Sequence, residues 1–112
     1  MTRSSTYKEY GLNSLEAKQY KKAIKDFDKA IELNPDNDIS WYFRGRSKYF
    51  LEQFEDAIKD LDKAIELDPE DFDSWYFRGF SKYSLEPISA VDSVRILLPD
   101  ADLTGPAVSD IS

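Results

Sequence analysis

The 112-residue sequence contains no cysteine and no histidine, and these two absences exclude several classes of chemistry. Without cysteine there is no disulfide framework and no thiol nucleophile. Without histidine there is no imidazole acid or base, and a zinc site built on Cys or His ligands is excluded as well. We therefore expect no cofactor and no metal, and only carboxylates, lysines and tyrosines remain for catalysis.

Long apolar runs and catalytic glycine motifs are also missing. Apolar runs such as Trp41-Tyr42-Phe43 are far too short to span a membrane, and the N-terminus lacks an apolar core of signal-peptide length. No glycine-rich phosphate loop and no Gly-x-Ser-x-Gly motif is present. The many carboxylates have no identifiable partner that would shift their pKa for acid or base work. We expect a cytoplasmic protein that is not an enzyme and has no membrane partner.

Positive charge is scarce as well. The chain has 15 Lys and Arg against 22 Asp and Glu, which gives a net charge of −7. An acidic chain repels the phosphate backbone of nucleic acids unless its basic residues gather on one face. Nucleic acid is therefore not an expected partner.

What the sequence does contain is an internal repeat of 34 residues. At this spacing the segment 41–51 matches 75–85 at nine of eleven positions, and 20–35 matches 54–69 at eleven of sixteen. A fixed period of this length is typical of repeat architectures, in which each unit buries its apolar face against its neighbours. The period divides the chain into units at 4–37, 38–71 and 72–98, followed by a tail at 99–112.

Each unit is predicted to contain two helices, because its apolar residues recur at helical spacing. The first helix of each unit is predicted near 5–17, 38–51 and 72–85, and the second near 20–33 and 54–67. Pro35 and Pro69 follow the second helices, and proline disfavours helical backbone in the residue before it. The Asp and Asn residues around these prolines are suited to cap the next helix.

Glycine recurs near the middle of the first helix of each unit, at Gly11, Gly45 and Gly79. Glycine costs a helix about 1 kcal/mol relative to alanine, so its recurrence indicates a close approach by the second helix. Arg44 and Arg78 stand directly before two of these glycines. We expect their side chains to reach a carboxylate on a second helix, such as Asp26 or Asp60.

This pattern resembles the tetratricopeptide repeat family, whose 34-residue unit carries a signature of Trp, Gly, aromatic, Ala, Phe, Ala and Pro. The second unit matches this signature with the residues Trp41, Gly45, Tyr49, Ala57, Leu61, Ala64 and Pro69. The resemblance implies an all-α fold, a right-handed superhelical solenoid of antiparallel helix pairs with about two and a half repeats.

The resemblance also implies a protein-interaction scaffold or adaptor whose first helices line a concave groove for an extended peptide or a partner helix. Carried onto this sequence, the predicted peptide-binding residues are Tyr42, Arg46, Tyr49, Tyr76, Phe77 and Phe80. Aromatic rings with a basic residue among them suit apolar anchors together with a carboxylate or phosphate. The alternative for Tyr49, and for Phe43 and Tyr83 beside this set, is a place in the core between repeats.

One well-known binding mode of the family is not expected in this chain. The carboxylate clamp that grips chaperone tails uses five Lys, Asn and Arg positions, of which only Lys8 is matched. The other four positions hold Leu12, Phe43, Asp73 and Phe77. We therefore predict a protein or peptide partner that is bound without this clamp.

The third unit departs from the pattern at Pro87. If one residue is deleted in the turn, the offsets of the preceding unit return and predict a short degenerate helix near 89–98, ended by Pro99. The alternative is an irregular segment after Pro87, which is favoured by Leu97 standing where the other units have alanine. An incomplete third unit would leave Trp75, Phe77 and Phe80 available for self-association. A homodimer, or docking on another repeat protein, is therefore the alternative function.

Overall fold

The computed structural model describes residues 2–86, and in this range the chain forms five α-helices. They are α1 (Arg3–Glu16), α2 (Tyr20–Leu33), α3 (Asp38–Phe50), α4 (Phe54–Leu67) and α5 (Phe72–Leu85). Each predicted helix before residue 86 is present, and its ends lie within two residues of the expected ones. The described residues form two helix pairs and one further helix, which is an all-α helical-repeat solenoid.

Local polar contacts mark where the first helix of each unit begins. The side chains of Thr2, Asn37 and Asp71 each accept a hydrogen bond from a backbone N–H in the first turn of α1, α3 and α5. These N-caps satisfy amides that have no partner within the helix. The second helices end at Leu33 and Leu67, and their C-cap residues Asn34 and Asp68 stand directly before the two prolines, as predicted.

The turns inside the two helix pairs have the same backbone geometry. Lys18 and Glu52, 34 residues apart, both adopt a left-handed conformation, with φ of 60° and 63°. In each turn the following residue donates a backbone hydrogen bond to the helix that has just ended, from Gln19 to Ser14 and from Gln53 to Lys48. The repeated turn therefore gives both units the same antiparallel pairing.

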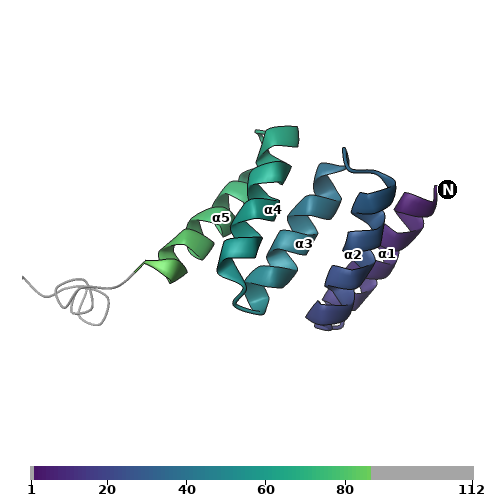
Figure 1. The fold of residues 1–112 in the computed structure, drawn as a ribbon, viewed down its shortest axis with the longest axis horizontal. Helices are drawn as coiled ribbons and strands as arrows, with labels where there is room; N and C mark the ends of the chain where they lie inside the picture. The colour runs from purple at the N-terminus through teal and green to yellow at the C-terminus, as the bar shows by residue number, and fades with distance from the viewer. Residues whose placement is uncertain (1, 87–112) are drawn as a thin grey trace, which may run out of the picture.

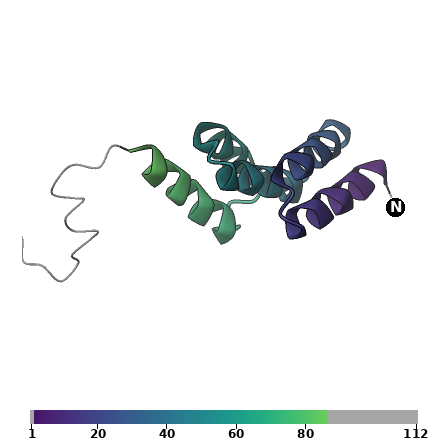
Figure 2. The ribbon, with the colours of Figure 1, turned by 90° about the horizontal axis from the view of Figure 1, so that it is seen from below.

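The helices are arranged in two layers. Consecutive helices pack against each other, and α3 also contacts both α1 and α5. In Figure 1 the five helices follow one another along the long axis, and Figure 2 shows α2 and α4 on one side of the array with α1 and α5 on the other. The core lies between the layers and is formed around the fully buried residues Ala23, Phe27, Ala30, Ala57, Leu61 and Ala64.

The first two glycines allow the close helix approach that the sequence predicts. A Cβ atom added to Gly11 would lie 2.7 Å from the ring of Phe27, and one added to Gly45 would lie 2.9 Å from Leu61 Cγ. Both distances are shorter than real Cβ contacts, so a side chain at either position would push the paired helix away. The cost of glycine in these helices is thus matched by tight packing against the next helix.

Gly79 differs from the other two glycines and corrects the expectation of a common role. It is exposed, and a Cβ atom added there would have no neighbour within 4 Å among the described residues. The predicted second helix of this unit, near 89–98, and the tail at 99–112 lie outside the described residues. Among residues 2–86, α5 therefore has neighbours only on the side of α3 and α4.

Candidate functional site

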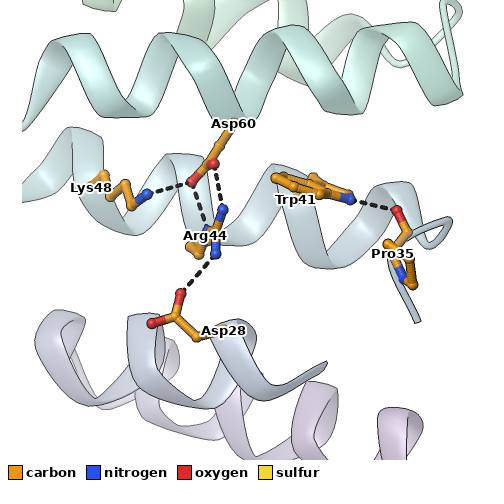
Figure 3. A network of polar contacts seen from close by, with 6 residues as sticks. All are labelled: Asp28, Pro35, Trp41, Arg44, Lys48 and Asp60. Carbon is orange, nitrogen blue, oxygen red and sulfur yellow. Dashed lines mark hydrogen bonds and ion pairs between the residues drawn. The ribbon is translucent and has the colours of Figure 1, made fainter. Parts of the chain in front are cut away.

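A buried ionic network fixes α3 between its neighbours. The Arg44 guanidinium donates to both oxygens of Asp60 on α4, at 2.9 and 2.7 Å, and to Asp28 on α2 at 2.7 Å. Lys48 Nζ lies 2.9 Å from the same Asp60 carboxylate (Figure 3). The expected pairing of Arg44 with Asp60 is confirmed, and the network joins three consecutive helices.

The network also changes the protonation energetics of Arg44. Burial lowers the pKa of this guanidinium, but hydrogen bonds and attraction from Asp60 and then Asp28 outweigh burial, so the pKa is raised. The carboxylate of Asp60 is only 4% exposed and is compensated by two cations. The role of the Asp60 carboxylate is therefore to stabilise the fold, because the removal of one of its partners would leave an uncompensated buried charge.

The link to Asp28 was missed by sequence reasoning, although the sequence carries a sign of it. Arg44 follows Asp28 by sixteen residues, and Arg78 follows Asp62 by the same number. In the structure Arg78 donates to Asp62, which repeats the link between α3 and α2 one unit later. A charge pair that recurs with the repeat period therefore indicates a contact between units.

An aromatic cluster lies where α3 meets α5. The ring of Tyr49 lies 5.3 Å from that of Phe77 and 6.4 Å from that of Phe80, and Tyr76 lies 4.8 Å from Phe80. Phe50 joins the cluster through Phe77 at 6.2 Å. We call these five residues, Tyr49, Phe50, Tyr76, Phe77 and Phe80, the aromatic face. The structure thus brings together four of the predicted site residues and adds Phe50 to them.

The members of the aromatic face differ in exposure. Tyr76 is 65% exposed and Phe80 43%, whereas Tyr49 and Phe77 are partly buried against the core. Tyr49 therefore contributes in part to the core between repeats, which was the alternative to a binding role for this residue. Exposed large rings beside one another are characteristic of interaction surfaces, because they bury much apolar area with few rotatable bonds.

Arg46 lies over the aromatic face. Its guanidinium carbon is 5.2 Å from the centre of the Phe77 ring and 5.8 Å from that of Phe50, within the range of cation–π attraction. Its Nε is buried without a hydrogen-bond partner, and no described carboxylate forms an ion pair with it. By contrast, Arg44 and Arg78 both hold carboxylates. Arg46 is therefore a cation with donor capacity to spare beside exposed rings.

Tyr42 is the predicted site residue that the structure buries: its ring lies 6.1 Å from that of Phe77, beside the aromatic face, but it is not presented at the surface. It is 7% exposed and belongs to the core cluster with Ala57, Leu61 and Ala64. Burial is the largest effect on its hydroxyl and raises its pKa, against a smaller opposing effect of Arg46. The expectation that its ring is presented to a partner is corrected, because the ring fills the space between α3 and α4.

The residues predicted for self-association lie on α5 but do not form one exposed patch. Trp75 is 47% exposed and Phe80 43%, whereas Phe77 is partly buried. The indole N–H of Trp75 donates to the Pro69 carbonyl at 2.9 Å, as Trp41 does to Pro35. Both indoles are therefore held in place by the turn that precedes their helix.

Every helix within residues 2–86 is amphipathic or short. No helix in this range is long and apolar enough to cross a membrane. The same residues contain no group of three or more acidic side chains placed to hold a metal ion.

Comparisons with known proteins agree with this architecture. The family model described as tetratricopeptide repeat matches residues 15–37 and 39–71, which together are half of the chain. No curated protein matches the sequence. Among solved structures, the TPR domain of Arabidopsis OM64 has a TM-score of 0.73 at 28% identity and covers 88% of this chain and 85% of its own.

Two other similar structures contain a bound peptide. The second TPR domain of Spaghetti (RPAP3), bound to the HSP90 peptide SRMEEVD, has a TM-score of 0.73 at 23% identity over 75% of this chain and 78% of its own. The first TPR domain of the same protein, with the same peptide, has a TM-score of 0.73 at 21% identity over 88% and 82%. The repeat period, the paired helices and these matches show that the chain belongs to the tetratricopeptide repeat family.

Proposed function

We propose that this chain is a protein-interaction module that binds a peptide or partner helix on the aromatic face, in the groove lined by the first helices of its repeats. The carrying observation is Arg46, which lies over Phe77 and Phe50 and has a buried Nε without a partner. A carboxylate on the ligand would accept hydrogen bonds from this guanidinium. Tyr76 and Phe80 would contact the ligand's apolar side chains.

The proposed ligand therefore combines apolar side chains with an acidic group, but it is not bound through the chaperone clamp. Four of the five clamp positions hold Leu12, Phe43, Asp73 and Phe77, none of which donates hydrogen bonds from its side chain to a carboxylate. The peptide SRMEEVD, seen in two similar structures, is accordingly a useful negative probe. We expect this chain to bind it weakly if at all.

A display selection of natural protein segments against the full 112-residue chain tests the proposal. Enriched segments should share apolar and acidic residues, and the double variant Arg46→Gln/Tyr76→Ala should lose them. Arg46→Gln alone should weaken the binding of an enriched peptide about ten- to a hundredfold, because hydrogen bonds to charged groups contribute about 1.5–3 kcal/mol. Arg3→Gln, which removes an exposed arginine from α1, is the matched control. If the double variant Arg46→Gln/Tyr76→Ala enriches the same segments as the unchanged chain, the proposal is contradicted.

Self-association through α5 is the second candidate function. It is favoured by Phe72, Trp75 and Phe80, which are 78%, 47% and 43% exposed. Light scattering over a range of concentrations should then show a homodimer that Phe80→Asp abolishes. Phe80 is a better position for this test than Phe77, whose ring packs on the core. A monomeric mass at every concentration would remove this candidate.

A further inference from the structure

Next to the aromatic face, α5 has a second surface that contains Gly79. This surface has different neighbours from the equivalent surface of α3, which contains Gly45. In α3, Gly45 is buried and the space for a Cβ is taken by Leu61 of α4. In α5, Gly79 stands 34 residues later with nothing within 4 Å of that space among the described residues. A glycine that allows close helix packing is therefore present without a packed helix in residues 2–86.

The charges on this surface show the same difference. Arg44 and Lys48 converge on the buried carboxylate of Asp60. Their equivalents in α5 are Arg78, whose Nε donates to Asp62 of the preceding unit, and Lys82, which is exposed. No described carboxylate occupies the position relative to these two cations that Asp60 has relative to Arg44 and Lys48. The surface thus holds two cations, and among residues 2–86 Lys82 forms no ion pair and Arg78 forms one, with Asp62.

The third feature is the tryptophan. Trp75 is 47% exposed, yet its N–H bond to Pro69 holds the ring as the bond to Pro35 holds Trp41. A side chain that is already held in its bound conformation loses little conformational entropy when a partner binds. We call Trp75, Arg78, Gly79 and Lys82 the open α5 face.

We propose that the open α5 face binds an amphipathic helix supplied by another protein, with the sequence pattern Ala-x-x-Asp-(Leu/Phe)-x-x-Ala. The pattern is taken from the two second helices of this chain, which carry it at 57–64 and 23–30. Small residues admit close contact with Gly79, and the aspartate pairs with Arg78 and Lys82. The partner helix would complete the third unit.

Two observations favour a helix from another protein. In α2 and α4 the alanines of the pattern are fully buried, so a second folded copy of this chain does not present them. With one residue deleted in the turn after α5, Ala90 aligns with Ala57, but Ser93 then stands in place of the aspartate and Leu97 in place of the second alanine. The chain's own residues there lack both the anion for the two cations and the second small residue.

The test uses a labelled peptide with the sequence of residues 54–67, titrated against the full 112-residue chain by fluorescence anisotropy. A lactam between the positions of Glu55 and Lys59, both exposed in α4, holds this short peptide helical. Binding is expected, and the peptide with Asp60→Asn should bind about ten- to a hundredfold more weakly. No binding of the parent peptide, or equal binding of the two peptides, would overturn the proposal.

Variants of the chain locate the binding surface. Gly79→Leu should abolish peptide binding without lowering the unfolding midpoint of the free chain, because leucine favours the helix over glycine and meets no neighbour there among residues 2–86. Lys82→Glu should weaken binding, whereas Lys25→Glu, the same charge change on exposed α2, should not. If Gly79→Leu instead destabilises the free chain, as is expected of Gly45→Leu, the chain's own residues fill the surface and the proposal fails. The surface excludes Arg46, Tyr76 and Phe80, so this outcome is independent of the aromatic face.

Discussion

The helices α3 and α5 carry nearly the same sequence in different surroundings. Trp41, Gly45 and Lys48 pack against α4, whereas Trp75, Gly79 and Lys82 are exposed. Nine of eleven residues are identical between segments 41–51 and 75–85, so the amino-acid sequence of the helix itself does not cause the difference in exposure. The difference follows the neighbours within residues 2–86: α4 packs on this surface of α3, and no helix in that range packs on the equivalent surface of α5. The same residue type therefore serves close packing in one unit and is exposed in the other.

The largest expected effect concerns the two aspartates that hold the arginines. Asp60→Ala should lower the free energy of unfolding by about 3–5 kcal/mol, because it leaves Arg44 and Lys48 without their shared anion in a buried place. Asp62→Ala, which removes the half-exposed partner of Arg78, should cost less than about 1 kcal/mol. Urea unfolding followed by circular dichroism measures both variants.

A conservative variant separates charge from packing at the first of these sites. Asp60→Asn keeps the shape of the side chain and removes its charge, so it should lose most of the stability that Asp60→Ala loses. If Asp60→Ala and Asp62→Ala lower the free energy of unfolding equally, the two aspartates contribute equally to stability in spite of their different burial.

The glycines give the next largest effect, and here the sign is expected to change between units. Alanine gains about 1 kcal/mol over glycine in a helix, at all three positions alike. At Gly45 and Gly11 the added Cβ meets Leu61 and Phe27 at under 3 Å, which adds an overpacking cost of about 1–3 kcal/mol. Gly79→Ala should therefore stabilise the chain, while Gly45→Ala and Gly11→Ala should leave it unchanged or destabilise it.

Thermal and urea unfolding of the three alanine variants test this sign change. The difference between Gly79→Ala and Gly45→Ala isolates the packing cost, because the helix propensity gain cancels. A loss of stability in Gly79→Ala would mean that the space beside Gly79 is occupied in solution.

Most of the fold could be predicted from the 34-residue repeat period. The period predicted the two helix pairs and the packing of Gly45, because each of these depends on spacing within a unit, whereas it did not decide between Asp26 and Asp60 as the partner of Arg44. It did not predict that Tyr42 is buried while Tyr76, its equivalent 34 residues later, is 65% exposed. That difference depends on which neighbours each helix has in space, and identical segments give no information about their neighbours.

The exposure of these two tyrosines leads to the smallest expected effect, a change of stability with pH. Burial raises the pKa of Tyr42 above its ordinary value near 10. The folded state then holds this proton more tightly than the unfolded state, so the stabilisation is complete below about pH 10 and is lost as the pH rises through the folded pKa. Tyr42→Phe should therefore flatten the decline in unfolding free energy between about pH 8 and about pH 11.

Lysines also titrate in this range, so the test depends on the difference between two variants and not on the wild-type curve alone. Tyr76→Phe removes the same hydroxyl from the exposed position of α5 and leaves every lysine in place. The wild-type curve minus the Tyr42→Phe curve should fall with pH more steeply than the wild-type curve minus the Tyr76→Phe curve. If the two differences run parallel, the Tyr42 hydroxyl has equal contact with water in the folded and unfolded states, and α3 is less tightly covered by α4 than the packing of Tyr42 implies.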